Sequence, residues 1–128
     1  MRVAILNIAE TGHRAVEAVK PAVLEFFGEN CEITATGNLF IGAIDVSDLE
    51  ATLRETVTRV DSALEQILPK ADAIVIVLTG PILIASVALQ RIIRRAAYKV
   101  ILIAQFDFQR KKYVFVEDRK LLEIIHRG

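Results

Sequence analysis

The sequence predicts an α/β domain in three layers, with a mainly parallel sheet and an antiparallel strand at its C-terminal edge. Two continuous apolar runs, Val3–Leu6 and Ala73–Leu78, are typical of strands that are buried on both faces. Segments with apolar residues at three- and four-residue spacing alternate with the strands, as expected for helices that cover a sheet. With 128 residues, of which 53% are hydrophobic, the chain suffices for one domain with a sizeable core, which we place over 1–128.

The first strand is predicted over Arg2–Ile8, with the loop Asn7–His13 at its end. Thr11 is placed to cap a helix whose apolar positions extend from residue 15 to residue 27. Pro21 lies inside this helix and is expected to kink it or to restart it.

The segment 31–44 is open to two interpretations. Glu32–Thr36 alternates like a strand, and Gly37-Asn38 permits a turn into a second short strand over 39–44. A single strand followed by an irregular segment is the alternative. Ser47–Glu50 then forms a capping box, which predicts the start of a surface helix.

The central apolar run Ala73–Leu78 breaks at Thr79-Gly80-Pro81, and an apolar helix is predicted over 82–97. Gly80 supplies a turn that other residues resist, and Pro81 suits the start of a helix. The helix is apolar enough to be buried. A membrane span does not fit, because the Gly80-Pro81 break falls in the middle of the apolar run and three arginines follow it, at 91, 94 and 95.

The C-terminal part begins with an apolar strand over 99–106. Gln109–Lys112 is a basic turn, after which 113–116 is predicted to return as an antiparallel edge strand. Asp107 is suited either to orienting a ligand group at the end of its strand or to capping the turn. Asp118 is expected to cap a last short helix.

The composition restricts the possible partners. The chain has 16 basic and 16 acidic residues, a balance that argues against binding of long nucleic acids. One cysteine, Cys31, excludes an internal disulfide and a cysteine-based metal cluster, and it is expected to act as a small apolar residue. The N-terminus enters a strand at once and lacks the pattern of a signal peptide, so we expect a cytoplasmic protein without a membrane partner. The apolar excess suggests burial between subunits.

Candidate binding groups lie in two loops. The sequence contains no GxGxxG, P-loop, HExxH or GxSxG motif, so no cofactor or metal is predicted. Right-handed crossovers place the two loops at one edge of the sheet, where backbone N–H groups of a helix start attract phosphate. The candidate ligand-binding residues are Asn7, Glu10, Gly12, Thr79, Gly80 and Pro81, and the candidate catalytic residues are His13 and Thr11. The alternative is purely structural: a helix cap, a solvated histidine and a tight turn.

The segment 71–117 resembles the small Rossmann-like proteins of type III CRISPR systems, namely the CRISPR-associated Rossmann fold (CARF) sensors and the ring nucleases. The likeness consists of a strand ending Leu78-Thr79-Gly80-Pro81, an apolar helix, and the strand Val100–Asp107 leading to Lys112-Tyr113-Val114. The first loop falls where such proteins place their other ligand loop.

The resemblance implies a homodimer with a two-fold axis over the carboxyl edge of the sheet, binding a cyclic oligoadenylate. In the ring nucleases the ligand is also cut without a metal: a 2′-hydroxyl attacks the adjacent phosphorus while the protein stabilises the developing charge. His13 or Thr11 would have to serve that step here. A chain of this size without an effector domain fits a ring nuclease or a sponge.

Two alternatives come from other functional classes. The chain is distantly similar to the mannose-type IIA phosphotransferase proteins, in which a histidine after the first strand carries a phosphoryl group. His13 would take that role, although it lies several residues later than expected and Thr79-Gly80-Pro81 replaces the usual acidic residue. The second alternative is a dimeric interaction module without a small ligand.

Overall fold

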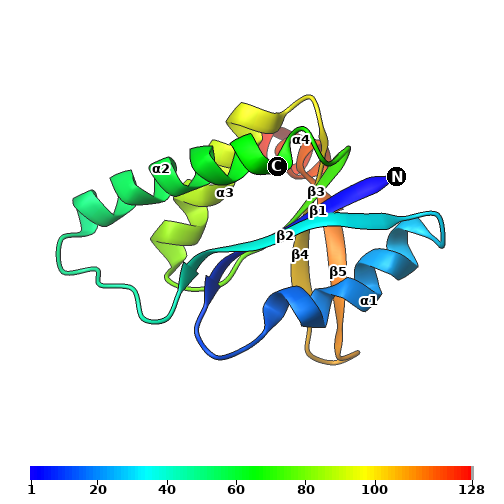
Figure 1. Cartoon of the computed structure of the whole chain (residues 1–128), viewed down its shortest axis with the longest axis horizontal. Helices are drawn as coiled ribbons and strands as arrows, with labels where there is room; N and C mark the ends of the chain where they lie inside the picture. The colour runs from blue at the N-terminus through cyan, green and yellow to red at the C-terminus, as the bar shows by residue number, and fades with distance from the viewer. Residues whose placement is uncertain (128) are drawn as a thin grey trace.

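A five-stranded sheet with the strand order β2-β1-β3-β4-β5 organises the molecule, which we describe from a computed structural model that covers residues 1–127 (Figure 1). β1, β2, β3 and β4 are mutually parallel, and only β5 runs antiparallel, next to β4. This arrangement confirms the predicted sheet. The strands are β1 (Arg2–Glu10), β2 (Glu32–Ile41), β3 (Ala73–Val77), β4 (Val100–Asp107) and β5 (Lys112–Glu117).

Helices cover both faces of the sheet and give a three-layer, Rossmann-like fold. α1 (Ala15–Phe27) packs on one face, and α2 (Leu49–Ile67) and α3 (Ile82–Ala96) pack together on the other. α4 (Asp118–Arg127) packs against β4 and β5. Because side chains alternate along a strand, Ile5 of β1 faces α1, whereas its neighbour Leu6 faces α2 and α3.

The two central strands are buried throughout, as their apolar runs predict. Val3–Ala9 of β1 and all of β3 are buried, since each strand has a neighbour on both sides and helices on both faces. Among residues 1–127, no helix combines the length and the apolar character that are needed to cross a bilayer.

The first two strands are longer than predicted. β1 continues to Glu10, two residues beyond the expected end, so the loop after it begins only at Thr11. β2 is one strand of ten residues followed by an irregular segment, which confirms the second interpretation of 31–44. The turn at Gly37-Asn38 is wrong: Gly37 pairs with Leu6 and Asn38 with Asn7. The parallel ladder with β1 outweighs the local turn preference of these residues.

The helix ends also differ from the expectation in places. α1 starts at Ala15 after Arg14, with no side-chain cap, so Thr11 does not cap it. Pro21 lies within one continuous helix rather than restarting it. The residue that caps α2 is Asp48, whose side chain accepts a hydrogen bond from the backbone N–H of Ala51 at 3.2 Å, and not Ser47.

α3 and α4 show two further differences. α3 is buried along one side only, and Ile82 in its first turn is 83% exposed, because the helix start projects beyond the edge of the sheet. Asp118 is the first residue of α4 and is buried, but its Oδ1 atom has no hydrogen-bond partner among the described residues, so the expected cap is absent.

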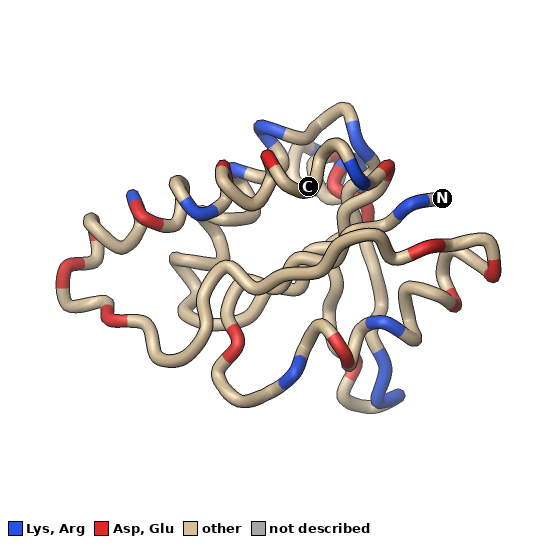
Figure 2. Tube along the Cα trace, viewed as in Figure 1, with Lys and Arg blue, Asp and Glu red and all other residues tan. Residues whose placement is uncertain are grey.

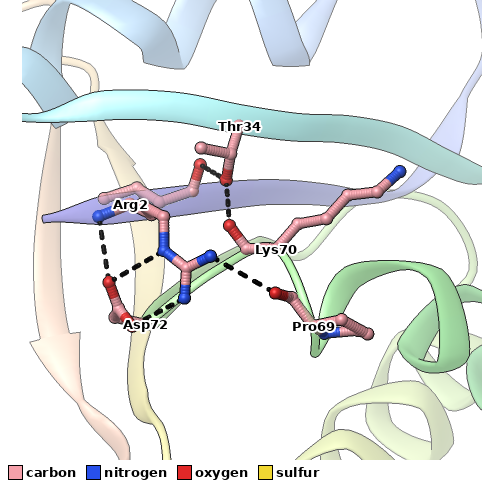
Figure 3. A network of polar contacts seen from close by, with 6 residues as sticks. Arg2, Thr34, Pro69, Lys70 and Asp72 are labelled. Carbon is pink, nitrogen blue, oxygen red and sulfur yellow. Dashed lines mark hydrogen bonds and ion pairs between the residues drawn. The ribbon is translucent and has the colours of Figure 1, made fainter.

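A polar network fastens the amino-terminal edge of the sheet (Figure 3). The guanidinium of Arg2 pairs with the carboxylate of Asp72 at 3.2 Å and donates to the backbone oxygen of Pro69 at 3.3 Å. The hydroxyl of Thr34 donates to the backbone oxygen of Lys70 at 2.7 Å. β1, β2 and the connection from α2 to β3 are therefore tied together at this edge, whereas the candidate loops lie at the opposite one.

An ion pair joins the two helices on one face. The guanidinium of Arg91 in α3 donates two hydrogen bonds of 2.9 Å to the carboxylate of Asp61 in α2, and Arg95 lies 3.4 Å from the same carboxylate. Hydrogen bonding from Arg91 holds the pKa of Asp61 below its ordinary value of 3.8. Since the bidentate geometry is favourable and both side chains are 30% exposed, this pair differs from the exposed pair of Arg54 and Glu50 on α2.

We expect Asp61→Asn to lower the free energy of unfolding at neutral pH. Because the folded-state pKa of Asp61 lies below the unfolded value, its stabilising effect is complete above the unfolded pKa and is lost as the pH falls through the folded pKa. The difference between wild type and variant should therefore shrink below about pH 4 in urea titrations at several pH values. Glu50→Gln removes an exposed pair with Arg54 and serves as the control with no measurable effect. A pH-independent difference for Asp61→Asn would contradict this account.

Candidate functional site at the carboxyl edge of the sheet

The candidate site lies where the chain leaves two neighbouring strands toward opposite faces. β1 leads into α1 on one face, and the adjacent β3 leads into α3 on the other (Figure 1). In open parallel sheets, this reversal leaves a crevice at the carboxyl ends of the two strands, and ligands bind there. The predicted loops Asn7–His13 and Thr79-Gly80-Pro81 fall at these two strand ends, where the loops of the structure are 11–14 and 78–81.

A chain of hydrogen bonds connects the strands at this edge of the sheet. The hydroxyl of Thr79 accepts from the backbone N–H of Ala9 at 2.9 Å and donates to Oδ1 of Asn7 at 2.6 Å. Nδ2 of Asn7 donates to Oδ1 of Asn38 at 2.8 Å, and Nδ2 of Asn38 lies 3.4 Å from a carboxylate oxygen of Glu10. Side chains thus join β1, β2 and the loop after β3 at the point where the ladder between β1 and β3 ends.

The predicted site residues divide into two groups. The hydrogen-bond chain brings Asn7, Glu10 and Thr79 together, with the Asn7 side chain fully buried and the hydroxyl hydrogen of Thr79 directed to Asn7. These side chains therefore hold the strand ends together through hydrogen bonds to one another and to the backbone. Thr11, Gly12 and His13 form an exposed bend after β1, and Gly80 and Pro81 are exposed before α3.

Gly80 is required by the close approach of the loop 78–81 to the end of β1. Its φ angle is +82°, and a Cβ atom at this position would lie 2.6 Å from the Cβ atom of Ala9. Ile44, in the loop after β2, is also within 4.0 Å of that position. Gly12 has a φ angle of +105°, but nothing lies within 4 Å of its Cβ position.

The start of α3 offers donors to a ligand. Pro81 occupies the N-cap position and provides no side-chain hydrogen bond, and the first helical bond runs from the N–H of Ala85 to the oxygen of Pro81. The N–H groups of the first turn, 82–84, therefore lack a capping side chain at the positive end of the helix dipole. An anion with accessible oxygens matches these donors.

A hollow lies on the α1 side of the same edge. It has a volume of about 660 Å³ and lies between α1 and the hairpin of β4 and β5. His13 lines it, so the exposed bend after β1 contributes to its wall. The remaining lining consists mostly of aromatic, basic and small apolar residues: Ala18, Pro21, Ala22, Glu25, Phe106, Phe108, Lys111, Lys112 and Tyr113.

Sequence reasoning missed the hairpin as part of a site. The signal was present in Phe106-Asp107-Phe108 followed by basic residues, but it favours a solvated edge turn when it is taken alone. Asp107 does cap this turn, as one of its two expected roles: its Oδ1 atom accepts from the N–H groups of Gln109 and Arg110 at 3.0 and 3.2 Å. Only the packing of α1 against β5 turns this hairpin into one wall of a hollow.

The described residues offer no group of three or more histidine, cysteine or carboxylate side chains arranged to hold a metal ion. Burial raises the pKa of the Cys31 thiol, which disfavours the reactive thiolate and agrees with a packing role. Comparison with known proteins gives no match: no protein-family model, no curated protein and no solved structure matches this chain. The functional argument therefore depends on the geometry of the edge.

We expect Thr79→Val to destabilise the protein by about 2 kcal/mol, because the N–H of Ala9 and Oδ1 of Asn7 would both lose their partner in a buried region. Thr79→Ser keeps the hydroxyl and should cost less than about 1 kcal/mol. Urea unfolding of both variants measures the difference. Equal stability of the two variants would show that the hydroxyl does not join the strands.

Gly80→Ala should destabilise the fold by about 2–4 kcal/mol, since backbone strain adds to the collision with Ala9. Gly12→Ala is the matched control, with strain but no collision, and should cost about 1–2 kcal/mol. Adding Ala9→Gly to Gly80→Ala removes the colliding Cβ atom and should restore the part of the stability that the collision costs. A double-mutant cycle of urea unfolding free energies measures this as a coupling energy between positions 9 and 80. Additive effects at positions 9 and 80 would argue against the close approach.

Proposed function

We propose that this protein binds a phosphate-bearing nucleotide at the carboxyl edge of β1 and β3, and that the ligand is a cyclic oligoadenylate. The observation that carries the proposal is the position of the two loops. The sequence predicts them as phosphate-binding candidates, and they follow the carboxyl ends of the adjacent strands β1 and β3, with the hydroxyl of Thr79 2.9 Å from the backbone nitrogen of Ala9. The first-turn N–H groups of α3 supply donors for a phosphate oxygen.

A homodimer over this edge is part of the proposal. Large apolar side chains are exposed after the carboxyl ends of β2 and β3, where a soluble monomer would favour polar ones. Ile82, at the start of α3, is 83% exposed. A two-fold axis through this edge would bury these side chains and would present the donors of both protomers to one cyclic, symmetric ligand. The exposed apolar residues concerned are Ile41, Val46, Leu49, Leu78, Ile82 and Leu83.

The proposal includes metal-independent cleavage of the ligand. In this step, the 2′-oxygen of one nucleotide attacks the adjacent phosphorus, and the bond from phosphorus to the 5′-oxygen of the next nucleotide breaks. The products carry a 2′,3′-cyclic phosphate and a 5′-hydroxyl, so one proton leaves the attacking oxygen and another reaches the leaving oxygen. His13, exposed in the bend after β1, is our candidate for moving a proton, and the Thr11 hydroxyl is our candidate for a hydrogen bond to a phosphate oxygen.

The test mixes the protein with radiolabelled cyclic tetra-adenylate and cyclic hexa-adenylate and follows binding and cleavage. We expect His13→Ala to slow cleavage by about 100-fold while the affinity stays within about twofold of wild type. The other histidine in the sequence, His126 in α4, provides the matched control, and His126→Ala should cleave normally. Sedimentation should show two chains for each bound ring.

The outcomes separate the alternatives. If both rings are ignored at micromolar concentration, the proposal fails. Binding without cleavage would indicate a sponge and would remove the catalytic role of His13. Transfer of a phosphoryl group to His13 from a phosphocarrier donor would instead favour the mannose-type IIA alternative. A tight dimer that does neither would favour the interaction module.

A further inference from the structure

The hollow between α1 and the β4–β5 hairpin has the features of a ligand site in its own right. Its volume of about 660 Å³ lies within the range of small-molecule sites. None of the residues of the second candidate loop, 78–81, lines it. It lies on the α1 face, whereas the start of α3 is on the other face of the sheet.

Three aromatic rings form one wall of this hollow. The ring of Phe106 lies 4.9 Å from that of Phe108 and 5.2 Å from that of Tyr113, both in edge-to-face geometry. Phe108 is 79% exposed although its ring is fully apolar. An exposed ring at the mouth of an apolar hollow is suited to stacking on a planar aromatic ligand.

The hairpin turn is held in a fixed shape that leaves two lysines available. The carboxylate of Asp107 accepts two backbone hydrogen bonds within the turn and pairs with Arg110 at 3.3 Å. Lys111 has a φ angle of +54°, which is uncommon for a residue other than glycine. Among residues 1–127, neither Lys111 nor Lys112 forms an ion pair, and Figure 2 shows this basic turn at the end of the hairpin.

The opposite wall of the hollow carries one acidic group, Glu25 of α1. A carboxylate in a hollow with two lysines would repel a phosphate placed beside it, but it accepts well from an amino group. The lining therefore combines aromatic rings for a planar base, a carboxylate for an exocyclic amine, and two ammonium groups for a phosphate.

We propose that this hollow binds an adenine-type nucleotide, with its base against Phe108, its exocyclic amine at Glu25 and its phosphate at Lys111 and Lys112. The inference differs from the proposed binding of cyclic oligoadenylate at the carboxyl edge of β1 and β3. It assigns a second nucleotide site, on the α1 face of the molecule, to Phe108, Glu25, Lys111 and Lys112, which the first proposal does not use; His13 of the first proposal also lines this hollow.

The test uses isothermal calorimetry on the full chain with 5′-AMP as the probe. Inosine monophosphate lacks the exocyclic amine, adenosine lacks the phosphate and ribose 5-phosphate lacks the base, so each compound removes one of the three inferred contacts. The sequence has no tryptophan and two tyrosines, so Tyr98→Phe leaves Tyr113 as the only tyrosine and its emission locates the ligand. We expect saturable binding of one AMP per chain, weaker binding of the three partial ligands, and a change in Tyr113 emission.

Three variants assign the contacts. Phe108→Ala should weaken AMP binding about tenfold, because base–aromatic stacking is lost. Glu25→Gln should remove the preference for AMP over inosine monophosphate, and Lys112→Gln should weaken AMP but not adenosine. Phe26→Ala is the matched control: Phe26 is an exposed aromatic residue of α1 that does not line this hollow, and its loss should leave AMP binding within twofold.

The inference is overturned if AMP gives no binding heat at millimolar concentration, or if Phe108→Ala binds AMP as wild type does while circular dichroism shows both folded. The two proposals fail separately. If the protein binds no AMP, and Phe108→Ala binds cyclic oligoadenylate as wild type does, the β1–β3 site is supported and the site in the hollow is excluded. If the protein binds AMP but no cyclic oligoadenylate, the site in the hollow is supported and the β1–β3 site is excluded.

Discussion

The hydrogen bonds of Thr79 are the constraint on which the candidate edge depends. The ladder between β1 and β3 ends with the pairing of Asn7 and Val77, yet β1 continues for three more residues. The N–H of Ala9 would therefore be left without a partner in a buried part of the sheet. The Thr79 hydroxyl accepts a hydrogen bond from the N–H of Ala9 and donates one to Oδ1 of Asn7. A side chain therefore continues the hydrogen bonding where the backbone of β3 turns away.

This arrangement explains why polar side chains occur inside an otherwise apolar sheet. Asn7 is fully buried, and such an amide is destabilising unless its oxygen and nitrogen both find partners. Thr79 and Asn38 provide them. The loop 78–81 is consequently held to β1 by buried hydrogen bonds. The groups at this edge that remain exposed are backbone N–H groups, apolar side chains and His13. A ligand at this edge would meet donors that are already oriented, which limits the entropy lost on binding.

The two inferred sites lie on opposite faces of the sheet and differ in the groups that would contact a ligand. At the start of α3 the donors are backbone groups, and residues 78–85 include no charged residue. In the hollow beside α1, the recognition groups are side chains, with rings from β4 and β5 facing Glu25 of α1. The formal net charge of zero does not reveal the local basic charge of the hairpin turn, because acidic residues elsewhere in the chain balance it.

Local patterns were sufficient for the elements and for the break that matters most. Continuous apolar runs identified the central strands, and Thr79-Gly80-Pro81 was correctly placed between β3 and α3. The same kind of reasoning left two interpretations open for β2, because Gly37-Asn38 favours a turn locally but pairs with β1 in the fold. It also placed Asn7 where the predicted strand Arg2–Ile8 and the predicted loop Asn7–His13 overlap, whereas Asn7 lies inside β1.

The sequence by itself determined the layered α/β architecture, since burial on one or both faces leaves a periodic trace in neighbouring residues. Only the tertiary structure decided how far β1 and β2 extend, which partners satisfy Asn7, and that a hairpin of aromatic and basic residues faces α1 across a hollow. These features depend on contacts between residues that are distant in the chain. A pairing of that kind has no period and leaves no local signature, so it becomes visible only when the strands and helices are in place.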